Sequence, residues 1–329
     1  MPRGCGRPVS KRTATVALPT KDLLGIEGLS AGDLAAVLDT AKGFKEVITR
    51  TVKKVPVLRG RTVVNLFFEN STRTRTSFEL AARRLDADVI NFDVATSSVA
   101  KGEALLDTIE TIEALGADYI VIRHGSSGAP HFLAKAVRAS VINGGDGAHE
   151  HPTQALLDAF TIQERLGKIE GLRVAIVGDI LHSRVARSNI IALQKLGAQI
   201  VLIGPPSLVP ESFLAYGVEI EHTLREGLRD ADIVYLLRIQ LERQRKNLFP
   251  SLDEYRLLYG INRERLGWAK PGALVMHPGP VNRGVEVSRD VMEMDESLIT
   301  TQVTNGVAIR MAVFYLLQGA REDVAAPHT

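Results

Sequence analysis

The hydrophobic and polar positions along the chain follow two alternating patterns. After Ser30, apolar residues recur at the three- and four-residue spacing of one buried helix face, at Leu34, Val37, Leu38, Ala41, Phe44 and Ile48. Elsewhere, continuous apolar runs such as 62–68 and 172–177 indicate strands that are buried on both faces. Strands that alternate with helices form a mostly parallel sheet with helices on both of its faces.

This alternation occurs twice along the chain. In the first half, strands are expected at 62–68, 89–92, 119–123 and 140–143, with a helix at 73–85. A helical pattern at 152–166 and a break at 167–171 separate the halves. In the second half, a helix is expected at 184–196 and strands at 172–177, 199–203, 218–220, 233–237 and 273–276.

We therefore predict an α/β protein of two doubly wound parallel-sheet domains, with the active site in the crevice between them. The expected bounds are 1–17 for a flexible tail, 18–150 for the first domain and 167–301 for the second. The helices 151–166 and 302–318 are expected to join the two domains.

Composition narrows the class of protein. The length of 329 residues fits two domains of about 150 residues each. Lysine plus arginine (40) nearly balance aspartate plus glutamate (38), so the bulk charge indicates neither a nucleic-acid nor a membrane partner. The only cysteine, Cys5, excludes a disulfide framework and fits a reducing compartment, so we expect a cytoplasmic protein. The apolar runs are far shorter than the ~20 residues that span a bilayer.

The segment 67–79 carries the sharpest chemical signal. An apolar strand leads into Ser71 and Thr72, which open a helix whose unpaired N–H groups and dipole favour an anion. Arg73 adds a planar guanidinium that matches phosphate oxygens. Arg75 points roughly 200° away around the helix, so we assign Arg73 to the ligand and Arg75 to a structural ion pair. A capped helix with surface arginines is the alternative.

Two more motifs in the first half lie where a ligand would bind. His151 precedes Pro152, a residue favoured at the first helical position, so His151 caps the helix and Gln154 shares its face. Both side chains can donate hydrogen bonds into one site. Arg123 ends a predicted strand, at the edge where open α/β sheets bind ligands. Taken singly, a packed histidine and a solvent-exposed arginine are the alternatives.

The second half supplies candidate carboxylate-binding residues. Arg184 opens a helix that follows a buried strand, which brings it to the crevice. Arg238 and Gln240 follow another strand, and a spacing of two in extended chain puts both side chains on one side. The residues after Gly178 lack the Gly-x-Gly-x-x-Gly pattern, which argues against a dinucleotide site.

Two loops complete the candidate chemistry. The small, polar segment 96–103 contains Ser97 and Lys101, and a lid whose lysine closes over an anion is about as well supported as a plain surface loop. The segment 277–280, His-Pro-Gly-Pro, leaves a strand with two prolines that lack an N–H. Its carbonyls can therefore accept from the amide or amine hydrogens of a ligand.

Together and in this order, these segments resemble the aspartate/ornithine carbamoyltransferase family. The resemblance covers about 18–317, and its most specific motifs are Ser-Thr-Arg-Thr-Arg at 71–75 and His-Pro-Thr-Gln at 151–154. It implies transfer of the carbamoyl group of carbamoyl phosphate to the amino group of L-aspartate, which gives N-carbamoyl-L-aspartate and phosphate in pyrimidine biosynthesis. No metal or organic cofactor is expected. The first domain would bind carbamoyl phosphate and the second aspartate.

The resemblance also implies residue roles. The residues expected around carbamoyl phosphate are Ser71, Thr72, Arg73, Thr74, Arg123, His151 and Gln154, with the backbone of Gly279 and Pro280 on the carbamoyl nitrogen. Those expected on the aspartate carboxylates are Arg184, Arg238 and Gln240. The catalytic set is Arg73, Thr74, Lys101, Arg123 and His151. In the family, Ser97 and Lys101 reach into the site of the adjacent subunit, so a homotrimer with shared sites is expected.

Aspartate is favoured over ornithine as the second substrate. The ornithine branch carries His-Cys-Leu-Pro where this chain has His-Pro-Gly-Pro at 277–280, and Arg238 with Gln240 suits an acidic substrate. Some aspartate members carry Leu-Pro-Arg where this chain has Gly-Pro-Val at 279–281, which leaves the link from this loop to domain closure open.

The chemistry expected of the family needs no side-chain nucleophile. His151 is expected to polarise the carbonyl as a neutral donor, while the departing phosphate takes the proton of the amine. A non-catalytic binding subunit and a dehydrogenase are the rival functions. A non-catalytic member would be expected to lose one of Arg73, Lys101, His151, Arg184 or Arg238, and all are present. Association with a regulatory chain or another pyrimidine-pathway enzyme stays open.

Overall fold

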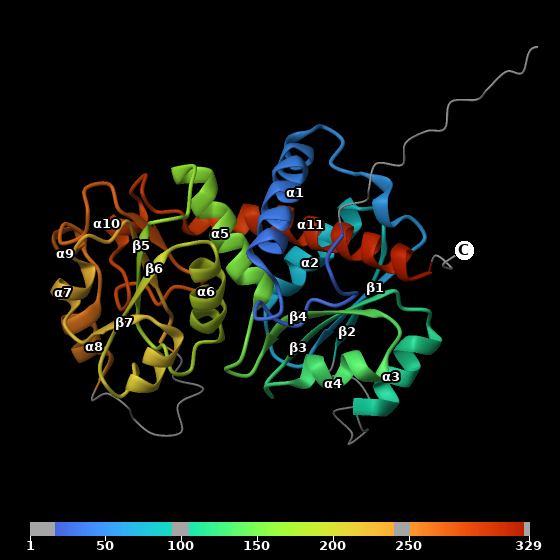
Figure 1. Cartoon of the computed structure of the whole chain (residues 1–329), viewed down its shortest axis with the longest axis horizontal. Coiled ribbons are helices and arrows are strands. Elements are labelled where there is room, and N and C mark those ends of the chain that lie inside the picture. The colour runs from blue at the N-terminus through green and yellow to red at the C-terminus, as the bar shows by residue number, and fades with distance from the viewer. Residues whose placement is uncertain (1–16, 94–104, 240–250, 326–329) are drawn as a thin grey trace, which may run out of the picture.

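Two parallel sheets lie side by side in the computed structural model, which describes residues 17–93, 105–239 and 251–325 (Figure 1). The first sheet has the order β2-β1-β3-β4, and its strands are β1 (Thr62–Phe67), β2 (Asp88–Asp93), β3 (Tyr119–His124) and β4 (Ser140–Asp146). The second has the order β7-β6-β5-β8-β9, and its strands are β5 (Arg173–Val177), β6 (Gln199–Ile203), β7 (Glu219–Glu221), β8 (Ile233–Leu236) and β9 (Leu274–Met276). All these pairings are parallel, so the predicted fold class is confirmed.

The strand order reverses once in each sheet, between β1 and β3 and between β5 and β8. In open α/β sheets, ligands bind outside the carboxyl ends of the strands at this reversal. Arg123 lies at the carboxyl end of β3, and the chain segments that leave β1, β5 and β8 lead to Ser71, Arg184 and Arg238, respectively. The topology therefore brings the basic candidates of both halves to the two binding edges.

Helices cover both faces of each sheet. In the first half these are α1 (Ala31–Thr49), the short η1 (Pro56–Leu58), α2 (Thr72–Arg84), α3 (Leu105–Ala114) and α4 (Ala129–Ala136). In the second half they are α6 (Arg184–Lys195), η3 (Glu211–Tyr216), α7 (Leu224–Leu228), α8 (Leu252–Tyr259), α9 (Arg263–Leu266) and α10 (Arg289–Met292). Val63 packs into one buried cluster and its neighbour Val64 into another, because successive strand side chains point to opposite faces.

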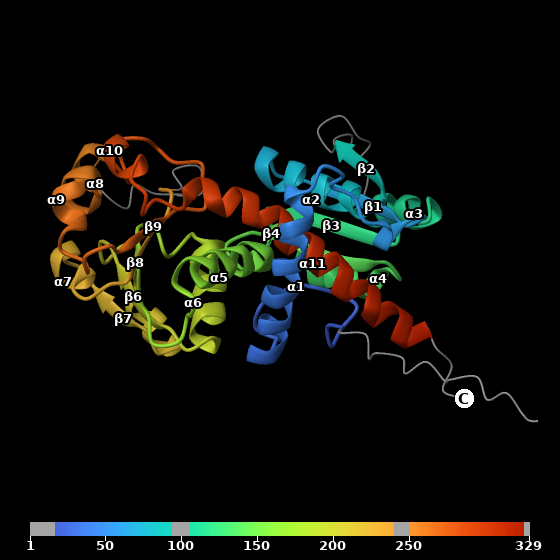
Figure 2. The same ribbon diagram turned by 90° about the horizontal axis from the view of Figure 1, so that it is seen from above.

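Two helices, α5 (Pro152–Leu166) and α11 (Ile299–Ala325), join the halves. Figure 2 shows α11 running from the second half across the first, and it packs against α1, α2, α5 and β9. Phe314 of α11 makes edge-to-face contacts with Tyr119 (5.5 Å) and Phe78 (6.0 Å) in the first half. These contacts fix the helix that carries one wall of the crevice.

The predicted elements differ from the observed ones mainly at their ends. The last helix was expected from 302, but it begins at Ile299, because the N–H of Gln302 donates to the carbonyl of Leu298 and completes a first turn from three β-branched residues. Of the predicted tail, residues 1–16 lie outside the described residues. None of the helices in the described ranges has the length and apolar character needed to cross a bilayer.

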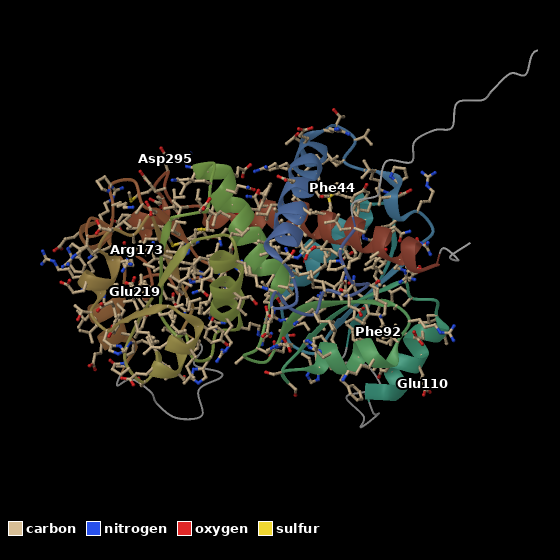
Figure 3. The ribbon with its side chains drawn as sticks, in the orientation of Figure 1. Phe44, Phe92, Glu110, Arg173, Glu219 and Asp295 are labelled. Carbon is tan, nitrogen blue, oxygen red and sulfur yellow. The ribbon has the colours of Figure 1, made fainter. Side chains whose placement is uncertain are left out.

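Each half also has a contact between its own elements that lies away from the crevice. At the far edge of the second sheet, Arg173 donates two hydrogen bonds to Glu219, at 2.9 and 2.7 Å (Figure 3). On the opposite half, the ring of Phe44 in α1 meets that of Tyr315 in α11 at 5.8 Å. Both contacts lie away from the crevice, so they belong to the scaffold.

Candidate active site

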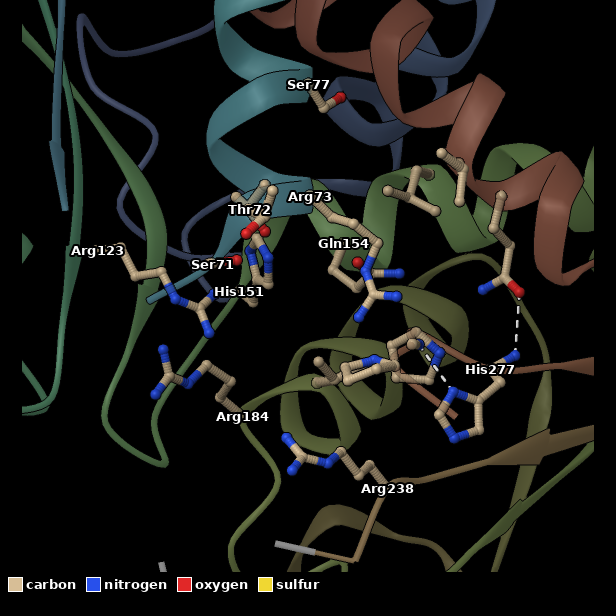
Figure 4. Close-up of a pocket in the computed structure, with 18 of the residues that line it drawn as sticks. Ser71, Thr72, Arg73, Ser77, Arg123, His151, Gln154, Arg184, Arg238 and His277 are labelled. Carbon is tan, nitrogen blue, oxygen red and sulfur yellow. Dashed lines mark hydrogen bonds between the residues drawn. The ribbon is translucent and has the colours of Figure 1, made fainter. Parts of the chain in front are cut away.

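A cavity of about 840 Å³ opens between the carboxyl ends of the two sheets. Its walls come from the segments after β1, β3, β5, β8 and β9 and from the helices α2, α5, α6 and α11. It is lined by every predicted site residue that the structure describes: Ser71, Thr72, Arg73, Thr74, Arg123, His151, Gln154, Arg184, Arg238, Gly279 and Pro280 (Figure 4). The other predicted site residues, Ser97, Lys101 and Gln240, lie outside the described residues.

The amino end of α2 forms one wall. Ser71 is the N-cap and makes no side-chain capping hydrogen bond, so this helix end, which lines the cavity, can offer its first N–H groups to an anion. Burial, and after it the nearby guanidinium of Arg238, lowers the pKa of Arg73. Two guanidinium groups that oppose each other across a cavity favour an anion between them.

Arg75 lies outside the cavity lining, as its position on the helix predicts. Its predicted ion pair stays a prediction. The hydrogen bond from Asn91, and after it Arg83 and lastly the charge of Arg75, lowers the pKa of Glu79, whose carboxylate pairs with Arg83 at 3.0 Å. The (i, i+4) spacing puts Glu79 and Arg83 on the same helix face, which explains why Arg83 takes the contact.

A glycine lets the loop after β9 approach Arg73. Gly279 has φ +64°, and a Cβ at this position would lie 2.8 Å from a terminal nitrogen of Arg73. The N–H of Gly279 donates to Nδ1 of His277 at 2.7 Å, and the N–H of His277 donates to Oε1 of Gln302 at 3.0 Å. This chain of hydrogen bonds holds the Gly279–Pro280 backbone against the guanidinium.

His277 is neutral. Burial, with the charges of Arg73 and Arg238, lowers the pKa of His277 to about 3. Because its Nδ1 accepts from Gly279, the single ring proton resides on Nε2, which has no hydrogen-bond partner among the described residues. The histidine therefore acts as a neutral support for the loop.

The amino end of α5 lies beside that of α2 in the cavity wall (Figure 4). His151 is the N-cap of α5 and is buried, and its N–H donates to the hydroxyl of Ser188 at 2.8 Å. The amide nitrogen of Gln154 donates to Oδ1 of Asp158 at 3.0 Å. The carboxylate therefore holds the NH₂ group of Gln154 and leaves its carbonyl oxygen for the cavity, while the predicted donation from Gln154 into the site stays a prediction.

Glu69 is a cavity residue that the sequence analysis missed. Its carboxylate contacts Arg184 at 2.9 Å and Arg123 at 3.4 Å. Gly145 permits this approach, because a Cβ there would lie 2.8 Å from Arg184 and 2.9 Å from Arg123. The only available signal was an acidic residue two positions before Ser71, at the end of a strand.

Two further buried polar residues were missed as well, and one of them, Arg310, lines the cavity. Arg310 of α11 is buried over the ring of Phe78 and donates to the hydroxyl of Ser77 at 2.9 Å. Burial lowers the pKa of Arg310 to about 10, so it remains charged at neutral pH. Glu286 holds the segment after β8, because it accepts from the N–H of Ile239 at 3.1 Å.

One cluster of potential metal ligands exists in the described part of the chain, outside the cavity lining. His131, Asp146 and His149 offer ligand atoms that all lie within 4.8 Å of one another. Asp146 already accepts from the N–H of Gly128 at 2.7 Å and from the amide of Asn143 at 2.8 Å. These contacts explain the buried carboxylate as a brace for the loop before α5.

The sequence matches two family models. Residues 21–164 match the carbamoyl-P binding domain of aspartate/ornithine carbamoyltransferase, and residues 170–317 match its Asp/Orn binding domain. The aspartate carbamoyltransferase catalytic subunit of Endomicrobium trichonymphae is 56% identical over 311 residues, 94% of this chain and 100% of that protein. The one from Halothermothrix orenii is 57% identical over 313 residues, with the same coverage.

Solved structures of both branches resemble the model. Aspartate transcarbamoylase from Trypanosoma cruzi in complex with carbamoyl phosphate and aspartate aligns with a TM-score of 0.83 at 32% identity, over 92% of this chain and 98% of that one. Ornithine carbamoyltransferase from Pyrococcus furiosus aligns with a TM-score of 0.80 at 31% identity, with the same coverage. The fold alone therefore does not distinguish the second substrate.

Proposed function

The chain belongs to the aspartate/ornithine carbamoyltransferase family, and we propose from this premise that it transfers the carbamoyl group of carbamoyl phosphate to the amino group of L-aspartate. The products are N-carbamoyl-L-aspartate and phosphate. The observation that carries the proposal is the convergence of five arginines on one cavity: Arg73, Arg123, Arg184, Arg238 and Arg310. A phosphate and two carboxylates bring the negative charge that these groups require.

Carbamoyl phosphate occupies the α2 and α5 side. The phosphate lies at the amino end of α2, where Ser71, Thr72 and Thr74 supply donors and Arg73 supplies charge. The position of Gln154 supports a further contact, because its carbonyl oxygen can accept from the carbamoyl NH₂ group. The backbone carbonyls of Gly279 and Pro280 are assigned to the same nitrogen.

The reaction depends on stabilising the negative charge that develops on the carbonyl oxygen of carbamoyl phosphate. The amine of aspartate attacks the carbonyl carbon, the C=O pair moves to oxygen, and donors from Thr74, Arg123 and His151 stabilise that oxygen. The carbon–oxygen bond to phosphate then breaks, and the leaving phosphate takes the proton of the amine. No side chain acts as a nucleophile. Holding both substrates in contact supplies the proximity contribution.

Aspartate binds on the second-half side. Arg184 and Arg238 line that wall, and they suit two carboxylates rather than the cationic side chain of ornithine. Gln240 is assigned to the same clamp. We expect carbamoyl phosphate to bind first, since it supplies the reacting carbon against which the amine is placed. Equal affinity for aspartate with and without carbamoyl phosphate would contradict that order.

The finer biological setting is part of the proposal. We assign 18–150 to carbamoyl phosphate binding and 167–301 to aspartate binding, with a homotrimer in which Ser97 and Lys101 enter a neighbour's site. A cytoplasmic location and a place in pyrimidine biosynthesis follow from the same assignment. Mixing inactive Arg73→Ala and Lys101→Ala chains tests the shared site. Mixed trimers regain activity only if a single site takes Arg73 from one chain and Lys101 from the neighbouring chain.

The direct test offers carbamoyl phosphate with L-aspartate and, in parallel, with L-ornithine. Phosphate release and the carbamoylated product are both measured, because carbamoyl phosphate also breaks down unaided. We expect turnover with aspartate and none above background with ornithine. Turnover with ornithine would overturn the assignment of Arg238, and no turnover with either in a verified trimer would favour a non-catalytic binding subunit.

A further inference from the structure

Asp158 is a buried carboxylate in the middle of α5, outside the cavity lining. Its Oδ1 accepts from the side-chain amides of Gln154 (3.0 Å) and Gln302 (2.7 Å). Its Oδ2 accepts from the amide of Asn189 (2.9 Å) and the hydroxyl of Tyr235 (2.6 Å). An ionised carboxylate has about four acceptor positions, so these four donors fill it.

Two of these donors connect Asp158 to the cavity. On one side, binding the NH₂ group of Gln154 leaves the carbonyl oxygen of that residue facing the site. On the other side, binding the NH₂ group of Gln302 turns its carbonyl oxygen towards the N–H of His277. His277 then holds the N–H of Gly279, as its dashed contacts in Figure 4 show.

We propose that Asp158 is a positioning residue that fixes both contacts to the carbamoyl nitrogen, through Gln154 on one side and through Gln302, His277 and Gly279 on the other. The inference rests on the proposed function and deepens it. The amides of Gln154 and Gln302 are each held with the NH₂ group on Asp158 and the carbonyl oxygen pointing away from it. An ionised carboxylate can hold both amides in this way because it accepts hydrogen bonds and donates none.

Protonation of Asp158 would remove its ability to accept hydrogen bonds from both amides. A carboxylic acid must donate one hydrogen bond, and a Gln154 amide that flips to accept it would turn its NH₂ group towards the carbamoyl NH₂ group. A Gln302 amide that flips would leave the N–H of His277 without its acceptor. Either change disorders the site without touching the substrate directly.

Burial and the groups that contact Asp158 place its titration near neutral pH. Burial raises the pKa of Asp158 to about 6, against the lowering effect of its four hydrogen bonds. Tyr235 of β8 has a pKa well above its usual value through burial, and Arg310 of α11 stays charged. Asn189 of α6 does not ionise. His277 stays neutral across the working range because its pKa is about 3.

The test measures kcat/KM for carbamoyl phosphate at saturating aspartate between pH 5 and 9. For the wild type, we expect an acid limb near pH 6. In Asp158→Asn, which nearly preserves volume, that limb disappears and activity at pH 8.5 falls by about 10²-fold, as expected for misplaced binding groups. A limb that belongs to His151 or to the substrate itself would persist in the variant.

Tyr235→Phe is the matched variant, and it keeps the test decisive if Asp158→Asn does not fold. It removes one hydrogen bond that lowers the pKa of Asp158, so the acid limb should move to higher pH. Activity at pH 8.5 should stay within about twofold, because Tyr235 does not line the cavity and Asp158 is then still ionised. A purely structural role would lower thermal stability without moving the limb.

An unchanged limb in Tyr235→Phe, or wild-type kcat/KM at pH 8.5 in a folded Asp158→Asn, would overturn the proposal. Both outcomes require an active wild type, so they leave the proposed function standing. A wild type that fails to carbamoylate aspartate would instead refute the function, and the assignment of Asp158 with it.

Discussion

The two sides of the cavity bind anions by different means. The first-half side uses the amino end of α2, whose N–H groups are fixed by the helix before any ligand arrives. The second-half side uses the long side chains of Arg184 and Arg238. Arg184 is already paired with Glu69, a carboxylate from the first half. The proposed phosphate site at α2 is therefore preformed by the backbone, whereas Arg184 of the proposed carboxylate site is paired with a carboxylate of the protein itself.

This difference predicts how each side responds to substitution. Loss of a cation from the preformed side should lower kcat, because the donors on that side are proposed to stabilise the charge that develops in the reaction. Loss of a cation from the other side should mainly weaken aspartate binding. The two sides can thus be separated by measuring kcat and the KM of each substrate.

Arg73→Ala should have the largest effect. We expect kcat to fall by about 10³-fold, because Arg73 is the only one of its helix's basic residues that lines the cavity within the described ranges. Steady-state kinetics at saturating substrates measure the loss. Arg75→Ala is the matched control, two positions away and outside the cavity lining, and it should stay within about twofold. Equal losses in both variants would contradict the assignment.

Arg238→Ala should act on the other side. Removing a charged hydrogen-bonding partner costs about 1.5–3 kcal/mol, which corresponds to a rise of about 10- to 10²-fold in the KM for aspartate. Binding of inorganic phosphate, followed by calorimetry, should change much less. A similar loss of phosphate binding would mean that the two sides are not separable.

The sequence predicted most of the fold and much of this contrast. Buried parallel strands appear as continuous apolar runs, and the motifs at 71–74 and 151–154 mark helix starts that local rules recognise. Glu69 and Asp158 were missed because their roles depend on partners from other elements, such as Arg184 and Gln302. The contact between the Gln154 amide and Asp158 was missed for the same reason.

His277 offers a smaller effect, on stability and its pH dependence. Its pKa in the folded chain is about 3, below the usual 6.5, so its contribution to stability is present above pH 6.5 and is lost as the pH falls. Between pH 8 and pH 5 this loss is about 2 kcal/mol. Chemical denaturation at both pH values should therefore show a smaller decrease for His277→Asn.

Comparison of this variant with the wild type is essential, because Asp158 titrates with the opposite sign. Its raised pKa of about 6 means that its contribution to stability decreases as the pH rises through that value. The difference between His277→Asn and the wild type cancels this contribution. An identical pH dependence in both proteins would show that burial and the two arginines do not hold His277 neutral.

The smallest effect is expected for Gly279→Ala, at the point where the loop after β9 meets Arg73 of the first half. Gly279 and Gly284 both have positive φ, at +64° and +80°, so alanine strains the backbone at either position. Only at Gly279 would the new Cβ lie 2.8 Å from Arg73, because nothing lies within 4 Å at Gly284. We expect a loss of about 10-fold in kcat/KM for carbamoyl phosphate in Gly279→Ala, since a displaced guanidinium no longer aligns with the phosphate. Gly284→Ala should lose as much thermal stability as Gly279→Ala but should retain activity. If both variants lost activity equally, strain in the loop rather than the approach to Arg73 would explain the glycine.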